Sequence, residues 1–272
     1  MIELSDTEFQ EVYQYIRGRY GLNLERKKYL LDSKLWIEVA RCRCDTFAEY
    51  WRMLRSDDSG AMERRMMNLL TTNYTFFCRE THHFDFLRRQ VIPVLPPGRT
   101  QPLRIWSAGC ATGQECYTLA MELSDCRMSG ALRIPYSILG TDLSETAVTA
   151  ARKGIYGSAD YARLPQAWQT RYCENFQDGQ FFVKDSLRSG VNFQRQNLMD
   201  LPPLVPTYDL VFCRNVLIYF QDKERAALVQ KLTEALQPGG YLMIGHTESL
   251  LAVPNRLQYV EPAIYRKPEA NA

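Results

Sequence analysis

Residues 103–115 read LRIWSAGCATGQE, and this stretch decides the fold. Its first part, residues 103–107, is a short apolar run of the kind that forms a buried β-strand. Gly109 and Gly113 then permit a tight turn, and we expect a helix from Gln114 onward. This order is typical of the first βα unit of a doubly wound sheet, in which a ligand binds at the carboxyl end of the strand. A tight turn without a ligand is the alternative interpretation.

The chain beyond this turn continues to alternate between strand and helix patterns. We expect strands at 136–141, 191–197, 208–213 and 241–245, and helices at 114–124, 144–153 and 223–236. Alternation at this spacing predicts a parallel sheet with helices on both faces. One segment, residues 154–190, interrupts the alternation, and its stretch FFVKDSLRSG predicts two short antiparallel strands. We interpret this segment as a small β insertion.

The N-terminal part of the chain has only helical patterns. Ser5 and Glu8 have the spacing of a capping box, and an apolar run of helical period follows them. Further helical runs lie at 25–41, 46–55 and 60–70, with no strand pattern among them. The sequence therefore predicts three parts: an all-helical domain over 1–70, a linker over 71–85 that contributes to a ligand site, and a doubly wound α/β domain over 86–272.

The composition excludes several classes of function. Of the 272 residues, 46% are hydrophobic and 24% charged, as in average soluble globular proteins. The 33 basic and 31 acidic residues give a net charge of only +2, which argues against a nucleic-acid partner. The N-terminus has no signal-peptide pattern, and no apolar run approaches the roughly 18 residues of a membrane span. We therefore expect a cytoplasmic protein that does not insert into membranes.

The cysteines and histidines do not have metal-binding spacings. The eight cysteines are Cys42, Cys44, Cys78, Cys110, Cys116, Cys126, Cys173 and Cys213. None forms a C-x-x-C pair, and Cys42-x-Cys44 is too tight and lacks a second pair. The three histidines are His82, His83 and His246, and we interpret the first two as helix residues. The sequence therefore predicts free thiols and no bound metal.

An acidic residue at the end of the second strand indicates which cofactor binds. Asp142 lies 29 residues after Gly113, where a carboxylate can accept hydrogen bonds from both hydroxyls of an adenosine ribose. An N-cap is the alternative role, although Ser144 could supply that cap. The turn has Ala111 and Gln114 in place of glycines of the G-x-G-x-x-G motif that binds a pyrophosphate. S-adenosylmethionine has no phosphate, so the pattern favours it over a nicotinamide dinucleotide.

A polar and aromatic segment joins the helical domain to the sheet. Residues 73–84 read NYTFFCRETHHF, in which Asn73, Thr75 and Arg79 alternate with aromatic side chains. Aromatic packing around a fixed cation is suited to a lid over a cofactor. The alternative is a packed interdomain linker with Arg79 facing water.

A second polar group follows the fourth strand of the α/β domain. Residues 212–220 read FCRNVLIYF, and Arg214 and Asn215 leave the strand end where class I methyltransferases contact substrate and cofactor. Tyr219 follows one helical turn later, and the alternative for it is a core tyrosine with a local hydrogen bond. The later segment LQPGGYL, residues 236–242, is similar to the L-x-P-G-G strand entry of the same enzymes.

Together these blocks resemble the CheR-type chemotaxis receptor methyltransferases over nearly the whole chain. The resemblance rests on the helical N-terminal domain, TTNYTFFCRETHHF, WSAGCATGQECYTLA, the Asp142 strand, Gln196-Asn197-Leu198, FCRNVLIYF and LQPGGYLMIGHTESL. It implies a Rossmann-like class I methyltransferase domain with a β insertion behind an all-α domain. The implied reaction is methyl transfer from S-adenosylmethionine to glutamate side chains in the cytoplasmic helical bundle of chemoreceptors. The products are glutamate 5-O-methyl esters and S-adenosylhomocysteine.

The resemblance also implies which residues form the site. The cofactor-binding residues are Asn73, Thr75, Arg79, Glu115, Asp142, Asn197, Leu198, Arg214 and Asn215. Arg79 and Tyr219 are then the catalytic candidates beside the transferred methyl group. A glutamate is ionised at neutral pH because its ordinary pKa is about 4.3, so this reaction requires no general base.

Two departures from the family pattern concern the receptor. The second helix usually presents several arginines, whereas residues 27–43 carry Lys27, Lys28, Lys34, Arg41 and Arg43 around the central Trp36, Ile37 and Glu38. We expect receptor contact with a different footprint, and a solvated helix face is the alternative. The turn NFQDG at 175–179 is short, so we expect no dependence on a C-terminal receptor peptide. We further expect a monomer.

Two other functions remain as alternatives. One is a class I methyltransferase that acts on RNA or a small molecule and uses the helical domain as a substrate lid. The other is a signalling module that binds the nucleoside without turnover.

Overall fold

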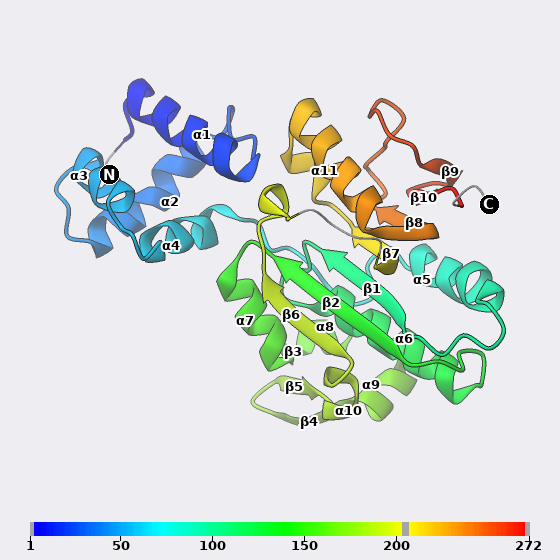
Figure 1. Cartoon of the computed structure of the whole chain (residues 1–272). Helices are drawn as coiled ribbons and strands as arrows, with labels where there is room; N and C mark the ends of the chain where they lie inside the picture. The colour runs from blue at the N-terminus through cyan, green and yellow to red at the C-terminus, as the bar shows by residue number, and fades with distance from the viewer. Residues whose placement is uncertain (1–2, 203–206, 270–272) are drawn as a thin grey trace.

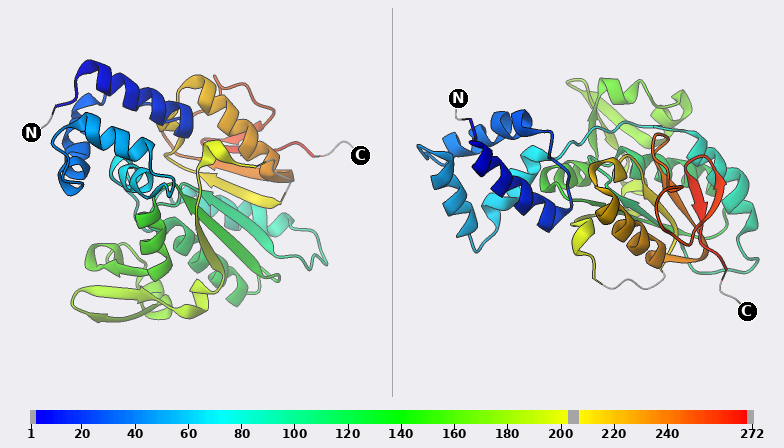
Figure 2. Two further views of the ribbon diagram at one scale, coloured as in Figure 1. Left: turned by 60° about the vertical axis from the view of Figure 1, so that its left-hand side comes forward. Right: turned by 90° about the horizontal axis from the view of Figure 1, so that it is seen from above.

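The computed structural model describes residues 3–202 and 207–269, without the side chains of 175–177. The N-terminal part consists of α1 (Asp6–Tyr20), α2 (Lys28–Arg41), α3 (Phe47–Arg55) and α4 (Ala61–Leu70). The predicted capping box at Ser5 is confirmed, because its side chain accepts from Glu8 N and the Glu8 carboxylate accepts from Ser5 N. These helices enclose a hydrophobic core of their own that includes Ile16, Leu31 and Met66. They form a separate unit at one end of the molecule (Figures 1 and 2).

A seven-stranded sheet forms the centre of the rest of the chain. Its strands are β1 (Leu103–Ala108), β2 (Tyr136–Asp142), β6 (Val191–Arg195), β7 (Tyr208–Cys213), β8 (Leu236–Ile244), β9 (Gln258–Glu261) and β10 (Ile264–Arg266). They follow the order β6-β2-β1-β7-β8-β10-β9, in which the first five are parallel to their neighbours. The expectation of a purely parallel sheet is wrong at this edge, because β10 and β9 are antiparallel. These two strands are short, and β9 is largely exposed, so they lack the apolar run that reveals the others.

Helices cover both faces of this sheet, as a doubly wound fold requires. The main ones are α6 (Gln114–Met128), α7 (Glu145–Lys153) and α11 (Asp222–Ala235). The side chains of β7 alternate between two cores: Leu210 and Phe212 join the core that contains α6, and Val211 and Cys213 join the core that contains α11. Alternation along one strand places successive side chains on opposite faces of the sheet. The fold class predicted from the sequence is therefore confirmed.

The segment after α7 contains a second, smaller sheet. It comprises β3 (Ile155–Gly157), α8 (Ser158–Tyr161), α9 (Gln166–Tyr172), β4 (Cys173–Gln177), β5 (Gln180–Val183) and α10 (Asp185–Arg188). Its three strands are antiparallel in the order β3-β5-β4, one strand more than the sequence predicted. Asp178 and Gly179, which connect β4 to β5, both have positive φ, as a tight two-residue hairpin turn requires. The prediction that the chain does not depend on a C-terminal receptor peptide rests on the turn at 175–179. The side chains of 175–177 in that turn lie outside the described residues.

The linker forms a short helical segment against the sheet. It ends in α5 (His82–Phe86), and a π-helical turn η1 (Leu87–Val91) and a 3₁₀ turn η2 (Ile92–Val94) follow at the start of the α/β domain. Two further 3₁₀ turns, η3 (Leu198–Asp200) and η4 (Leu217–Tyr219), follow β6 and β7. In the described part of the chain, no helix is both long enough and apolar enough to cross a membrane.

The N-terminal helices face the carboxyl ends of the parallel strands (Figure 1). Leu22, just after α1, forms an isolated β-bridge with Phe220, and Asn23 N donates to Tyr219 O at 2.8 Å. Arg17 of α1 forms an ion pair with Glu224 of α11 at 3.2 Å. These contacts fix the helical unit over the edge of the sheet at which doubly wound folds bind ligands.

Candidate active site

A cavity of about 430 Å³ lies between the N-terminal helices and the carboxyl edge of the sheet. This volume is within the usual range for small-molecule sites. All ten residues that the sequence analysis proposed for the site line it: Asn73, Thr75, Arg79, Glu115, Asp142, Asn197, Leu198, Arg214, Asn215 and Tyr219. The structure thus brings the ten residues together, and their individual roles remain predictions.

The glycine turn after β1 forms one wall of the cavity. Gly109 has φ of 90°, and a Cβ added there would lie 2.3 Å from Val216 Cγ2, so only glycine fits. The amides of Gly109 and Cys110 both donate to Thr141 O, at 2.8 and 2.9 Å. Ala111 also has a positive φ, of 47°. The turn is therefore held against the end of β2, where its residues line the cavity.

Asp142 ends β2 and projects into the cavity. One carboxylate oxygen accepts from Ala111 N at 2.9 Å and the other from Ser144 N at 2.8 Å. Ser144 caps α7 itself by accepting from Ala147 N, so the N-cap role considered for Asp142 is filled. Burial raises the pKa of Asp142, and the amides of Ser144, Ala111 and Leu143 oppose that rise. Because a carboxylate oxygen accepts about two hydrogen bonds, each oxygen can accept one more.

A buried arginine joins the linker to the sheet on the other side of the cavity. Only 2% of the Arg214 side chain is exposed, and its guanidinium lies 3.3 Å from Glu80 and 3.1 Å from Glu115. It also donates to the carbonyl of Arg79. Glu115 accepts a further hydrogen bond from Ser107 Oγ at 2.7 Å. The two carboxylates balance the buried charge, without which burial would be costly.

Arg79 lies on the linker where the backbone is strained. Its neighbours Cys78 and Glu80 have φ of 58° and 54°, in the left-handed region that non-glycine residues rarely adopt. The Arg79 guanidinium donates to Tyr74 O at 3.1 Å and lies 5.6 Å from the Phe76 ring centroid. Strain of this kind persists where the surrounding structure holds it, and it clusters at functional sites. The side chain lines the cavity beside these aromatic groups, and its Nε lies 3.8 Å from the Glu80 carboxylate.

Asn215 has an unpaired polar atom. The residue has φ of 59°, and its backbone amide donates to Glu248 Oε2 at 2.9 Å. Glu248 also accepts from Gly245 N at 2.6 Å and Ile218 N at 3.2 Å. Burial raises the pKa of Glu248, and the amide hydrogen bonds oppose that rise. Asn215 Oδ1 is buried without a partner, and such an atom is suited to accept from a ligand.

The remaining predicted residues lie nearer the helical unit. Asn197 donates to Arg19 O at 2.8 Å and accepts from Met199 N at 3.1 Å, so its amide group already joins α1 to the sheet. Leu198 is buried at the cavity wall. Tyr219 is half-buried, and Lys27 Nζ lies 5.5 Å from its ring centroid. Asn73 donates to Ser144 Oγ at 3.3 Å. Thr75 also lines the cavity.

Sequence reasoning missed two carboxylates of the site, Glu80 and Glu248. Glu80 pairs with Arg214, and Glu248 holds three backbone amides around Asn215. One sequence feature could have revealed Glu80: it is an acidic residue directly after Arg79, within an aromatic segment. Glu248 had no comparable signal, because its role is to hold backbone amides of a loop that is distant in sequence.

The cysteines are free, as predicted, but the histidines have an unexpected arrangement. All eight cysteines are unpaired. His82 begins α5, and His83 is completely buried. The pKa of His83 is lowered to about 2, mainly by burial and also by the charges of Arg214, His82 and His246, and a backbone interaction with Ala263 opposes this.

The fold and the cavity define a class of protein. A doubly wound sheet with a glycine turn after the first strand and a carboxylate at the end of the second is characteristic of the class I, S-adenosylmethionine-dependent methyltransferases. The chain belongs to the CheR methyltransferase family. Residues 7–71 match the family's all-alpha domain, and residues 73–265 match its SAM binding domain.

Individual relatives agree with this assignment. A chemotaxis protein methyltransferase of Borreliella burgdorferi is 35% identical, over 98% of this chain and 96% of the relative. Chemotaxis protein methyltransferase Cher2 of Pseudomonas putida is 34% identical, over 93% of this chain and 94% of the relative. A solved S-adenosylmethionine dependent methyltransferase from Mesorhizobium loti is 22% identical with a TM-score of 0.31. The match covers 59% of this chain and about half, 52%, of that one. The assignment therefore rests on the family domains and the curated relatives.

Proposed function

We propose that this chain transfers the methyl group of S-adenosylmethionine to glutamate side chains of chemoreceptors and so contributes to adaptation in chemotaxis. The observation that carries the proposal is the single cavity in which the predicted cofactor residues and two catalytic candidates meet. Membership of the CheR methyltransferase family and the names of the relatives support the same reaction class.

The residues present fit an adenosyl ligand. We propose that Asp142 accepts from the ribose hydroxyls, because each of its oxygens has one acceptor position left after the backbone hydrogen bonds. Asn215 Oδ1, which is buried and unpaired, supplies another acceptor for the ligand. The ion pairs of Arg214 with Glu115 and Glu80 hold the end of β7 against α6 and the linker. Asn73, Thr75, Asn197 and Leu198 complete the proposed cofactor site.

The proposed chemistry needs alignment more than proton transfer. S-adenosylmethionine supplies a methyl group on a sulfonium cation; as the acceptor oxygen forms its bond to carbon, the carbon–sulfur bond breaks and S-adenosylhomocysteine is released. An acceptor glutamate is already a carboxylate at neutral pH. Arg79 orients this carboxylate, and the hydroxyl of Tyr219 donates to it. A dry site that fixes this alignment supplies a large part of the rate enhancement.

The surface of α2 supports receptor contact with an unusual footprint. Tyr29, Trp36 and Ile37 are exposed on this helix, and Tyr29 is 84% exposed. Its basic residues are engaged within the chain: Lys28 pairs with Asp32, Lys34 donates to Leu69 O, and Arg41 pairs with Glu38. We propose that the apolar side chains contact the receptor bundle, and that basic residues contribute less than is usual in the family.

Other features of the function follow from the resemblance. We propose that the chain acts as a cytoplasmic monomer, without a tether to a C-terminal receptor peptide. We also propose the division into a helical domain over 1–70, a linker over 71–85 and a catalytic domain over 86–272. The separate core of α1–α4 supports the first boundary.

A methyl-transfer assay tests the proposed function. Purified chain is incubated with S-adenosylmethionine labelled in the methyl group and with membranes that contain chemoreceptors. The expected result is receptor-bound label that is released as methanol by mild base, because a glutamate methyl ester is base-labile. Base-stable label would indicate another acceptor, and absence of label with bound cofactor would indicate a module without turnover.

A further inference from the structure

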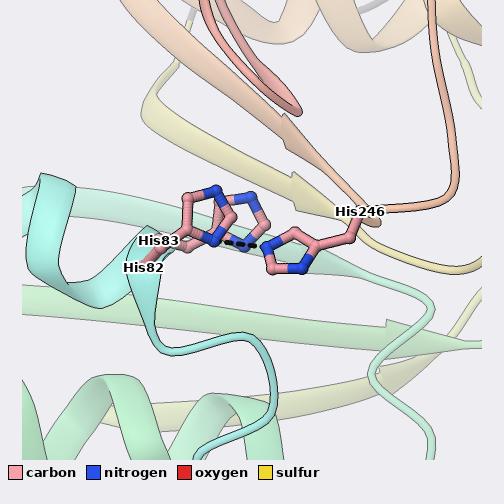
Figure 3. A group of neighbouring side chains, drawn as sticks. All are labelled: His82, His83 and His246. Carbon is pink, nitrogen blue, oxygen red and sulfur yellow. Dashed lines mark hydrogen bonds between the residues drawn. The ribbon is translucent and has the colours of Figure 1, made fainter.

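The only three histidines of the chain lie together next to the active site. His82 and His83 begin α5, and His246 follows β8 and points toward them from the other side (Figure 3). One ring nitrogen of each lies within 4.8 Å of the others. The ring centroids of His83 and His246 are 3.9 and 4.1 Å from that of His82. The fold therefore gathers every imidazole of the chain at one point, although 164 residues separate His82 from His246.

The hydrogen bonds of His82 set its tautomer. Its Nε2 lies 3.2 Å from the carbonyl oxygen of Pro262, which can only accept a hydrogen bond. Nε2 therefore carries the proton, and the Nδ1 lone pair faces Nε2 of His246, to which it is hydrogen-bonded. A ligand histidine in a metal site likewise donates one nitrogen to a carbonyl, and a bound ion would take the place of the hydrogen bond between His82 and His246.

His83 supplies an independent observation. Its side chain has no exposed surface, and neither ring nitrogen makes a hydrogen bond of normal geometry. An unsatisfied polar group in the interior costs about 1–3 kcal/mol, and such a group usually has a partner. A metal ion between the three rings would supply that partner.

We propose that His82, His83 and His246 form a binding site for one divalent transition-metal ion of the zinc class. Imidazole nitrogens suit zinc, copper and nickel, and three of them with one open position are an established zinc coordination set. His82 is half-buried and the side chain of His246 is 46% exposed, so these two rings have room to rotate around the buried His83 toward zinc–nitrogen bonds of about 2.0–2.1 Å.

The charges around the cluster are compatible with a dication. Glu80 Oε2 lies 3.8 Å from His83 Nδ1 and 4.0 Å from His246 Nε2, and it also pairs with Arg214 at 3.3 Å. This carboxylate also lies 3.8 Å from Arg79, and its single negative charge offsets part of the positive charge on each side. A bound ion would hold α5 against the segment after β8. Glu80, which lies beside both the histidines and Arg214, would link the metal site to the cavity. The proposal replaces the expectation of no metal, which considered spacing along the sequence rather than proximity in the fold.

Zinc titration of the untagged full chain tests the site. The chain is first treated with a chelator, and zinc is then titrated in competition with a chromophoric chelator. We expect one equivalent bound with a dissociation constant in the micromolar range or tighter. His82→Ala and His246→Ala should each weaken binding at least about tenfold. The matched control is the double variant Cys42→Ser, Cys44→Ser, which removes two thiols of the N-terminal helical unit. This variant should bind zinc as wild type does.

Cobalt substitution separates histidine from cysteine ligands without any variant. We expect a visible cobalt spectrum without a thiolate-to-metal charge-transfer band, and a thermal midpoint that rises with zinc concentration. The proposal is overturned by absence of saturable binding, by a thiolate band, or by unchanged affinity in His82→Ala and His246→Ala variants that still unfold cooperatively. These readouts do not depend on methyl transfer, so the site and the proposed function can fail separately.

Discussion

The two sides of the cavity are built from different kinds of group. On the β1 and β2 side, backbone amides surround one carboxylate, Asp142, whose oxygens are each half satisfied. On the β7 side, the buried Arg214 pairs with Glu80 of the linker and with Glu115 of α6. The first arrangement is suited to recognition of a neutral ribose, and the second to control of charge beside a reacting group. The comparison predicts that substitutions on the first side change cofactor affinity, whereas those on the second side change turnover.

The largest expected effect is that of Arg79→Ala. This change removes the cation proposed to orient the acceptor carboxylate, and loss of one such group typically lowers turnover about 100-fold or more. The side chain contacts Tyr74 and Phe76 at the cavity rim rather than a core, so the thermal midpoint should change little. Single-turnover methyl transfer and thermal unfolding measure the two quantities.

Arg79→Lys is the matched control for that prediction. Lysine keeps the charge but lacks the planar fork, so its turnover should fall between those of wild type and Arg79→Ala. Wild-type turnover in Arg79→Ala would remove the residue from the reaction and weaken the comparison between the two sides.

Asp142→Asn should be next in size and should act on affinity. Loss of hydrogen bonds to a charged acceptor costs about 1.5–3 kcal/mol, which corresponds to roughly 10- to 100-fold weaker binding of S-adenosylhomocysteine. Burial raises the pKa of Asp142, so wild-type affinity should fall as the pH is lowered through that raised pKa and the acceptor becomes protonated. The variant has no titrating group there, and calorimetry at several pH values should show a flatter profile. A variant with unchanged affinity would contradict the proposed ribose contact.

Tyr219→Phe should have a smaller effect that is confined to turnover. It removes one hydroxyl and leaves the ring against its neighbours, so turnover should fall about tenfold, which corresponds to about 1.5 kcal/mol, the lower end of the range for a hydrogen bond to a charged group. Affinity for S-adenosylhomocysteine should remain within about twofold of wild type, a change of less than 0.5 kcal/mol. Equal losses of affinity and turnover would place Tyr219 on the binding side of the comparison.

The smallest expected effect concerns the ion pair between the helical unit and the sheet. Arg17 is partly exposed and pairs with Glu224 at 3.2 Å. Exposed ion pairs contribute little to stability, so the free energy of unfolding of Arg17→Ala should lie close to that of wild type. Denaturant unfolding measures it, with Arg26→Ala, an exposed arginine beyond α1, as the control. A loss of several kcal/mol would show that the helical unit depends on this contact.

The sequence predicted the first two strands and the helical unit well for a physical reason. The apolar run at 103–107 and the capping box at Ser5 depend only on residues close together in the sequence, so they can be recognised without knowledge of the fold. The strands β9 and β10 were missed because they are only four and three residues long, and β9, at the sheet edge, is also exposed, so neither contains a long apolar run. The site residues that lie in the quoted sequence motifs line one cavity in the structure. Glu248 and the histidine cluster were not predicted, because their roles depend on proximity between segments far apart in the chain.

The most direct test of the account is calorimetric titration of S-adenosylhomocysteine into the folded chain. The account predicts one site per chain with a dissociation constant in the micromolar range or tighter, together with a rise in the thermal midpoint on binding. A chain that unfolds cooperatively but shows neither binding heat nor a shifted midpoint would contradict the central claim that the carboxyl edge of this sheet holds an adenosyl group.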